Sequence, residues 1–124
     1  MSGVQVLTDR HRTARTHHRC ELCTRRIDPG ETYRDQRAVY DCRAYTFKTC
    51  QHCETAVAVF DLWSEVDHDE GISFYHLDEY EPVDDHTAHV KAGWDARWRH
   101  SDGALWDIPQ RAPIEQPEKM EQVA

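Results

Sequence analysis

The chain has 124 residues, of which 39% are hydrophobic and 31% charged, and its formal net charge is −8. This length allows one domain, or one domain with an appendage, and the mean hydropathy of −0.86 indicates a small core. No apolar run of about 18 residues and no signal-peptide pattern is present, so we expect no membrane partner and a cytoplasmic location.

Charge is distributed unevenly along the chain. Residues 1–53 contain ten Lys or Arg and six Asp or Glu, a net charge of +4, whereas residues 54–124 contain five and seventeen, a net charge of −12. A basic half followed by an acidic half predicts two surfaces with different partners. The alternative is that both are ordinary solvated faces.

The N-terminal segment is rich in arginine and histidine. We expect a short strand at Val4–Thr8 and an edge strand at Thr13–Thr16, which leads into the first cysteine pair.

Two Cys-x-x-Cys pairs dominate the sequence: Cys20 with Cys23, and Cys50 with Cys53. This spacing lets both sulfurs of a tight turn, a zinc knuckle, reach one ion at about 2.3 Å. Four thiolates complete a tetrahedral Zn²⁺ site and leave no open position, so we predict one structural zinc ion. Disulfides are the alternative, but five cysteines without a secretory signal fit them poorly. Cys42 is then a free thiol.

Between the two pairs, the pattern predicts a β-hairpin. Asp28-Pro29-Gly30 is a turn signal, and Thr32–Tyr40 and Ala44–Thr49 alternate like strands. After Cys53, apolar residues recur at three- and four-residue steps from Glu54 to Val66, which predicts an amphipathic helix. Its positive N-terminal end would favour the thiolates beside it.

The remaining chain predicts shorter elements. Residues 67–71 break the helix and Ile72–Leu77 favours a strand. Val83–Ala92 favours a short helix, and Arg97–His100 with Ala104–Ile108 favours a second hairpin. Residues 109–124 contain three prolines and few large apolar groups, which is typical of a disordered tail.

The sequence therefore predicts a small α+β protein. Knuckle, hairpin, second knuckle and helix follow one another in the order of the treble-clef zinc finger, and this region resembles that fold group. We expect a zinc-binding module with its basic strand at 1–66, an acidic, Trp-containing extension packed on it at 67–108, and the tail at 109–124.

The basic residues around the first knuckle have two interpretations. They offset the formal −2 charge of a zinc tetrathiolate, a role open to Arg19, Arg25, Arg26, Lys48 and His52. Alternatively they contact nucleic-acid phosphates, while tyrosines and Phe47 of the hairpin stack on bases. The candidate nucleic-acid-binding residues are Arg12, Arg15, Arg19, Arg25 and Arg26.

The C-terminal half offers weaker candidates. Trp94, Trp98 and Trp106 either form the core of the extension, which we favour, or stay exposed as anchors for a protein partner. His86 and His89 share one helix face and are candidates for a second metal site with His76 or His68, although nine histidines make chance pairs common.

The treble-clef order is also similar to that of HNH nucleases. Those enzymes need a histidine base on the hairpin and further ligands on the helix, but residues 32–49 and 54–66 contain no histidine. A nuclease is therefore only a remote alternative, and we predict no enzymatic activity.

Residues 15–60 also resemble the small zinc-finger proteins encoded by bacteriophages of actinobacteria. The residues that carry the resemblance are His18–Cys23, Asp28–Glu31, Ala38–Asp41 and Tyr45–Cys53. The resemblance implies a virus-encoded protein directed at its host or associated with a genome.

Two functions remain in view. The first is a non-catalytic, zinc-stabilised module that binds or inhibits a host protein, such as part of a nucleic-acid-handling complex, through its acidic C-terminal surface. The second is a DNA- or RNA-binding zinc finger that uses the basic N-terminal face.

Overall fold

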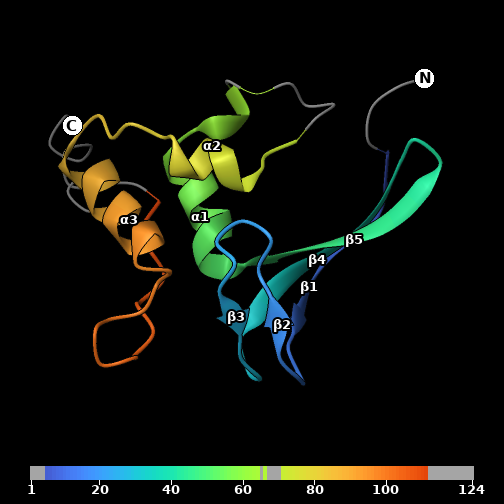
Figure 1. Cartoon of the computed structure of the whole chain (residues 1–124), viewed down its shortest axis with the longest axis horizontal. Helices are drawn as coiled ribbons and strands as arrows, with labels where there is room; N and C mark the ends of the chain where they lie inside the picture. Colours follow the sequence, from blue (N-terminus) through green and yellow to red (C-terminus); the bar gives the residue numbers. More distant parts are fainter. Residues whose placement is uncertain (1–4, 65, 67–70, 112–124) are drawn as a thin grey trace, which may run out of the picture.

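The computed structural model describes residues 5–64, 66 and 71–111. Three antiparallel strands form the main sheet in the order β1-β4-β5, and a two-stranded ribbon pairs β2 with β3 (Figure 1). The strands are β1 Gln5–Thr13, β2 His18–Arg19, β3 Arg26–Ile27, β4 Thr32–Tyr40 and β5 Arg43–Cys50. The helices are α1 Gln51–Val59, the 3-10 turn η1 Leu62–Ser64, α2 Phe74–Asp78 and α3 Asp85–Asp95. The predicted α+β class is confirmed.

Strand β1 is one continuous element rather than the two short strands predicted at Val4–Thr8 and Thr13–Thr16. It pairs with β4 over its length, with a register shift between Val6 and Thr8 that leaves Leu7 as a bulge residue. All nine of its residues are exposed, so it lacks the buried, alternating face by which strands are recognised in a sequence.

The predicted hairpin between the cysteine pairs is present as β4 and β5. Its turn residues Asp41 and Cys42 have φ of 54° and 65°, a left-handed conformation suited to a two-residue hairpin turn. Cys42 is exposed, in agreement with a free thiol.

Helix α1 begins three residues before the predicted Glu54 and ends at Val59, well short of Val66. The chain leaves the helix at Asp61, where φ is 54°, and continues as η1. The apolar periodicity continues through this break, which explains the overlong prediction.

The C-terminal elements differ from expectation in two places. The strand predicted at Ile72–Leu77 is instead helix α2, because Ser73 and His76 form a reciprocal capping box at its start. The predicted second hairpin is reduced to one bridge between Arg99 and Leu105, since Arg97 and Trp98 adopt positive φ and turn the chain. A helix overlaps the short helix predicted at Val83–Ala92, namely α3, Asp85–Asp95. Most of the predicted tail, residues 112–124, lies outside the described residues.

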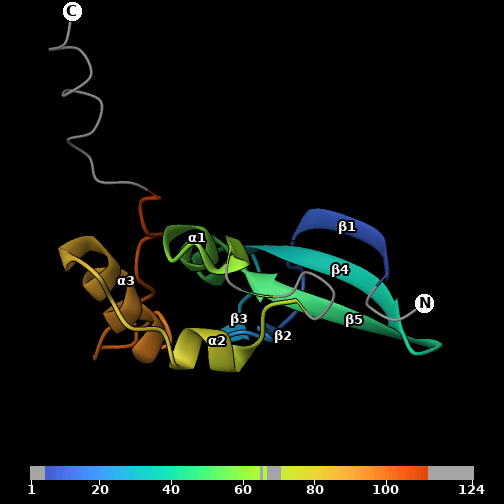
Figure 2. The same cartoon turned by 90° about the horizontal axis from the view of Figure 1, so that it is seen from above.

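One hydrophobic core joins the cysteine region to the C-terminal helices. Its largest fully buried side chains, the cysteines aside, are Trp94, Trp98, Ile27, Leu77 and Val90. Figure 2 shows α1 and α3 on one side of the molecule, while the hairpin projects to the other. In the part of the chain that the structure describes, no helix has the length and apolarity needed to span a bilayer.

Candidate metal centre and charged surfaces

The two cysteine pairs meet in the core. Cys20, Cys23, Cys50 and Cys53 are each 0% exposed, and their four sulfurs lie within 4.8 Å of one another. The Cys23 and Cys50 sulfurs are 3.9 Å apart. In a tetrahedral site with metal–sulfur bonds of about 2.3 Å, neighbouring sulfurs are about 3.8 Å apart. None of the five cysteines forms a disulfide. The four thiols therefore fit a single tetrahedral metal ion.

Local structure explains how each pair is positioned. The first pair lies in the turn of the β2–β3 ribbon, which is closed by hydrogen bonds from Cys20 N to Arg25 O and from Thr24 N to Cys20 O, both 2.9 Å. Thr24 has φ of 67°, a conformation that β-branched residues rarely adopt. The second pair spans the first turn of α1, with Cys50 as the residue before the helix. Free backbone N–H groups at this end favour negative charge.

Three N–H groups donate to the sulfurs. The backbone N–H groups of Leu22 and Cys50 each lie 3.4 Å from Cys20 Sγ, and the indole Nε1 of Trp98 lies 3.3 Å from Cys53 Sγ. Such bonds stabilise thiolates and orient them toward a shared ion. Trp98 contacts a predicted ligand from 45 residues away, a contact that local spacing in the sequence does not encode.

The protonation of this cluster is unequal. A hydrogen bond with Cys20 acts to raise the pKa of Cys50, but bonds with Cys23 and Cys53 outweigh it and lower that pKa to about 6. Burial raises the pKa of Cys53 well above its usual value. Four buried thiols this close cannot all ionise without a cation among them, which is the situation that a bound metal resolves.

A buried ion pair flanks the cluster. The Arg25 guanidinium, with a side chain only 2% exposed, forms bonds of 3.0 and 2.9 Å to the two carboxylate oxygens of Glu31. Burial opposes ionisation of both groups, yet the pair raises the pKa of Arg25 and lowers that of Glu31. The Cys50 sulfur also raises the pKa of Arg25. Of the residues predicted to offset the metal-site charge, both Arg25 and His52 interact with the Cys50 sulfur.

Arg25 was also predicted to bind nucleic acid. That prediction is wrong, because a side chain with almost no exposed surface cannot contact a phosphate group. The other four candidate arginines are exposed. Arg12 contacts Asp35 at 3.4 Å, Arg26 contacts Asp28 at 3.1 Å, and Arg19 donates to Thr24 O.

Two of the three candidate tryptophans are fully buried and the third is partly buried. Trp94 and Trp98 are 0% exposed, so neither presents a surface to a protein partner, and the core interpretation holds for both. Trp94 donates from Nε1 to Leu22 O at 3.2 Å, and Trp106 is partly buried with its carbonyl accepting from His52 Nε2 at 2.6 Å. These contacts join the C-terminal segment to both cysteine pairs.

The part of the chain that the structure describes does not bring the predicted second metal site together. His86 Nε2 lies 2.8 Å from Gln110 O, and the His89 ring packs on Trp106 at 5.2 Å. Among the described residues, the four cysteines are the one group of three or more side chains with the spacing of a metal site. His68 lies outside those residues.

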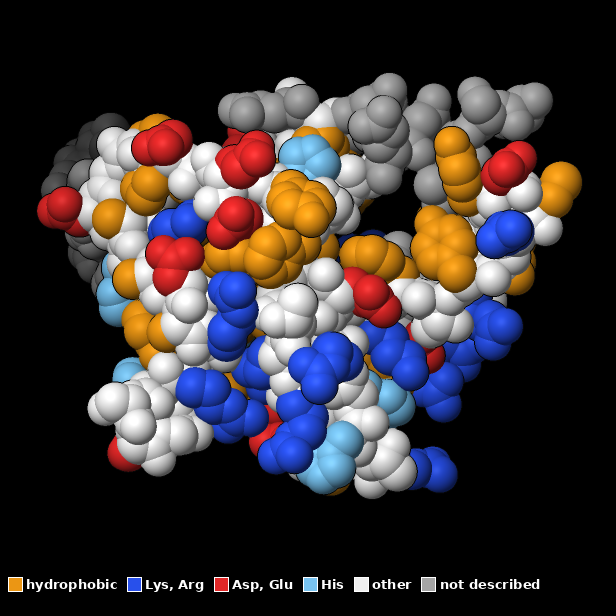
Figure 3. Space-filling model, viewed as in Figure 1, with side chains coloured by type: hydrophobic (Ala, Val, Ile, Leu, Met, Phe, Trp, Pro, Cys, Tyr) orange, Lys and Arg blue, Asp and Glu red, His pale blue; other side chains and the backbone are white. Residues whose placement is uncertain are grey.

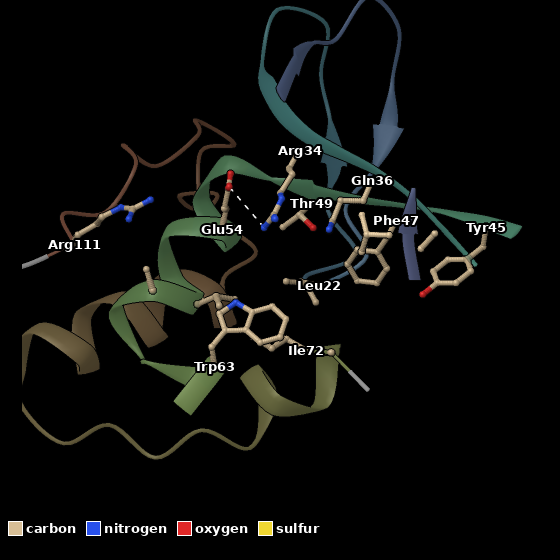
Figure 4. Close-up of a pocket in the computed structure, with 15 residues that line it drawn as sticks. Leu22, Arg34, Gln36, Tyr45, Phe47, Thr49, Glu54, Trp63, Ile72 and Arg111 are labelled. Carbon is tan, nitrogen blue, oxygen red and sulfur yellow. Dashed lines mark ion pairs between the residues drawn. The ribbon is translucent and has the colours of Figure 1, made fainter. Parts of the chain in front are cut away.

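A groove with a volume of about 330 Å³ runs between the main sheet and the helical part. Its sheet side carries Phe47 and Tyr45, and its helical side carries Trp63 (Figure 4). Arg34 and Glu54, 3.9 Å apart, lie at its polar end. Of the aromatic rings predicted to stack on bases, Tyr45 and Phe47 therefore line this groove, whereas Tyr33 is buried.

No protein-family model, curated protein or solved structure matches this chain.

Proposed function

We propose that the protein is a non-catalytic interaction module stabilised by one Zn²⁺ ion. The observation that carries this proposal is the complete burial of all four cysteines around one point. Four thiolates fill a tetrahedral shell, so such a site has no position for substrate or water and serves stability instead. Cys20, Cys23, Cys50 and Cys53 would hold the ion, which would supply the charge that keeps four thiolates together.

The arrangement of elements supports a treble-clef assignment. The β2–β3 ribbon supplies the first knuckle, the β4–β5 hairpin follows, and the second knuckle opens α1. In this proposal the C-terminal extension packs on that module through the core tryptophans.

We assign protein binding to an acidic surface on the C-terminal extension. It consists of exposed carboxylates between α2 and the start of α3, together with two exposed apolar side chains, Tyr75 at 67% and Val83 at 78%. The carboxylates are Asp78, Glu79, Glu81, Asp84 and Asp85. Figure 3 shows acidic side chains gathered over α2 and α3. Exposed apolar side chains and exposed carboxylates in one segment suit a partner with a basic, partly apolar surface.

The partner class follows from this chemistry. Proteins that handle nucleic acid carry basic surfaces, and an acidic module that covers such a surface inhibits it by competition. The resemblance to phage-encoded zinc-finger proteins makes a host protein of this kind the expected target.

Site-specific crosslinking tests the assignment. A photo-crosslinking amino acid at Val83 in the zinc-loaded protein is expected to capture one basic protein from an actinobacterial lysate, whereas the same group at Gln5, on the opposite part of the molecule, is not. Replacing Asp78, Glu79 and Glu81 with their amides should weaken that capture. Equal capture from both positions, or capture that ignores the amide substitutions, would contradict the proposal.

A further inference from the structure

The register of the main sheet sorts its charged and aromatic residues onto opposite faces. Paired residues in antiparallel strands share a face, and neighbours along a strand alternate. Thr8, Arg37 and Thr46 form one cross-strand row, and Arg10, Asp35 and Lys48 form the next. Arg12 follows in the row of Tyr33. One face thus carries Arg10, Arg12, Arg37 and Lys48, and we call it the basic face.

The cations of the basic face differ in how far they are open to a ligand. Arg10 and Arg37 are exposed and form no ion pair with any described residue. Arg12 keeps 52% of its side chain exposed while it contacts Asp35, and Lys48 Nζ lies 3.1 Å from His18 Nδ1.

Among the paired residues of this face, Asp35 is the carboxylate, and it is 14% exposed and already bound to Arg12. The exposed Arg19 and Arg26 lie on the adjacent β2–β3 ribbon, which extends the positive surface. In Figure 3, Lys and Arg side chains gather in the lower part of the view, apart from the acidic cluster over α2 and α3.

Within the described strands, the basic face carries no exposed Phe, Tyr or Trp ring. Tyr33 is 5% exposed and lies under His18, whose ring centroid is 4.8 Å from its own. Tyr45 and Phe47 pair with Ala38 and Gln36 on the other face, which lines the groove. Single-strand binders combine cations with rings on which bases stack. Here the cations of the basic face lie on the opposite side of the sheet from Tyr45 and Phe47. Arg34, on the side of those rings, is paired with Asp9 and Glu54.

From this separation we propose that the basic face binds the phosphate backbone of double-stranded nucleic acid without reading its bases. Cations alone suffice for such binding, since phosphate contacts carry affinity and orientation but no sequence information. The site lies on a different surface from the proposed protein-docking site, so either can fail without the other.

Fluorescence anisotropy with the full-length, zinc-loaded protein tests this site. The probes are a labelled 20-base-pair DNA duplex and the matching single strand, titrated over a range of salt concentrations. We expect tighter binding of the duplex, independent of its sequence. The double variant R10Q/R37Q should bind the duplex at least about tenfold more weakly at low salt. It should also flatten the dependence of log affinity on log salt by about 1.8, because about 0.9 is lost per phosphate contact.

The matched control is R43Q. Arg43 is an exposed arginine of the same hairpin that pairs with Tyr40 on the opposite face, so its substitution should leave duplex binding nearly unchanged. A second variant, T46E, keeps every arginine and adds a carboxylate to the row of Arg37, and it should also weaken binding. Zinc content and circular dichroism of each variant verify its fold.

Three results would overturn the proposal. They are absence of duplex binding by the wild type, single-strand binding as tight as duplex binding, and equal effects of R10Q/R37Q and R43Q. Equal affinity for polyglutamate would do the same, because it would reduce the site to general attraction of polyanions.

Discussion

At the residue scale, burial distinguishes the four cysteines of the candidate metal site from Cys42. Cys42 is exposed at the hairpin tip, whereas the other four are buried, and N–H groups donate to the sulfurs of Cys20 and Cys53. The spacing of the two pairs allowed these four to be identified from the sequence, because a knuckle is a local structure. The Trp98 contact could not be, since it depends on how residues 45 positions apart pack together.

Thr24 provides a test of local strain at the first knuckle. Its φ of 67° suits glycine and costs a residue with a Cβ atom about 1–2 kcal/mol. We expect Thr24→Gly to raise the free energy of unfolding of the zinc-loaded protein by up to about 1 kcal/mol, after the entropy cost of glycine. Chemical denaturation measures it. Thr46→Gly, at an exposed strand position, should destabilise, and the same loss from Thr24→Gly would refute the strain argument.

At the scale of elements, the local sequence pattern predicted some helices and strands correctly and gave the wrong element for others. The β4–β5 hairpin followed from alternation and turn chemistry, and the helix after the second cysteine pair followed from apolar residues at three- and four-residue steps. The pattern of Ile72–Leu77 favoured a strand, but the Ser73–His76 capping box gives a helix. Strand β1 has no buried face, so its nine-residue length arises from pairing with β4 rather than from its own sequence.

Helix α3 contains an interior glycine with a packing role. A Cβ atom at Gly93 would lie 2.4 Å from Trp98 Cζ3 and 2.8 Å from Trp106 Cζ3, closer than any real contact. Alanine gains about 1 kcal/mol in helix propensity, but overpacking costs about 1–3 kcal/mol. We expect Gly93→Ala to destabilise the protein in thermal unfolding.

A double-mutant comparison separates these effects. In a Trp98→Phe background, which removes the closest ring atoms, Gly93→Ala should cost less than in the wild type. An equal cost in both backgrounds, or a stabilising effect in the wild type, would argue against close packing at Gly93.

At the scale of the whole molecule, the cysteine cluster and the C-terminal segment are joined by direct contacts. Trp94 and Trp98 bond to the first and second knuckles respectively, and Arg99 contacts Asp28 at 2.8 Å. A protein with a small core usually needs a bound metal or a similar crosslink for stability.

We therefore expect chelation of the metal to disrupt the C-terminal packing as well. The disruption should be seen as a red shift of tryptophan fluorescence and a loss of near-ultraviolet circular dichroism in one transition. Unchanged tryptophan signals after metal removal would mean that the two parts fold independently.

The most direct test of the central claim is native mass spectrometry of freshly purified protein. The account predicts one zinc ion per chain, retained in Cys42→Ser and lost in Cys53→Ser. A wild-type protein without metal, or a Cys53→Ser variant that binds zinc as tightly as the wild type, would contradict it.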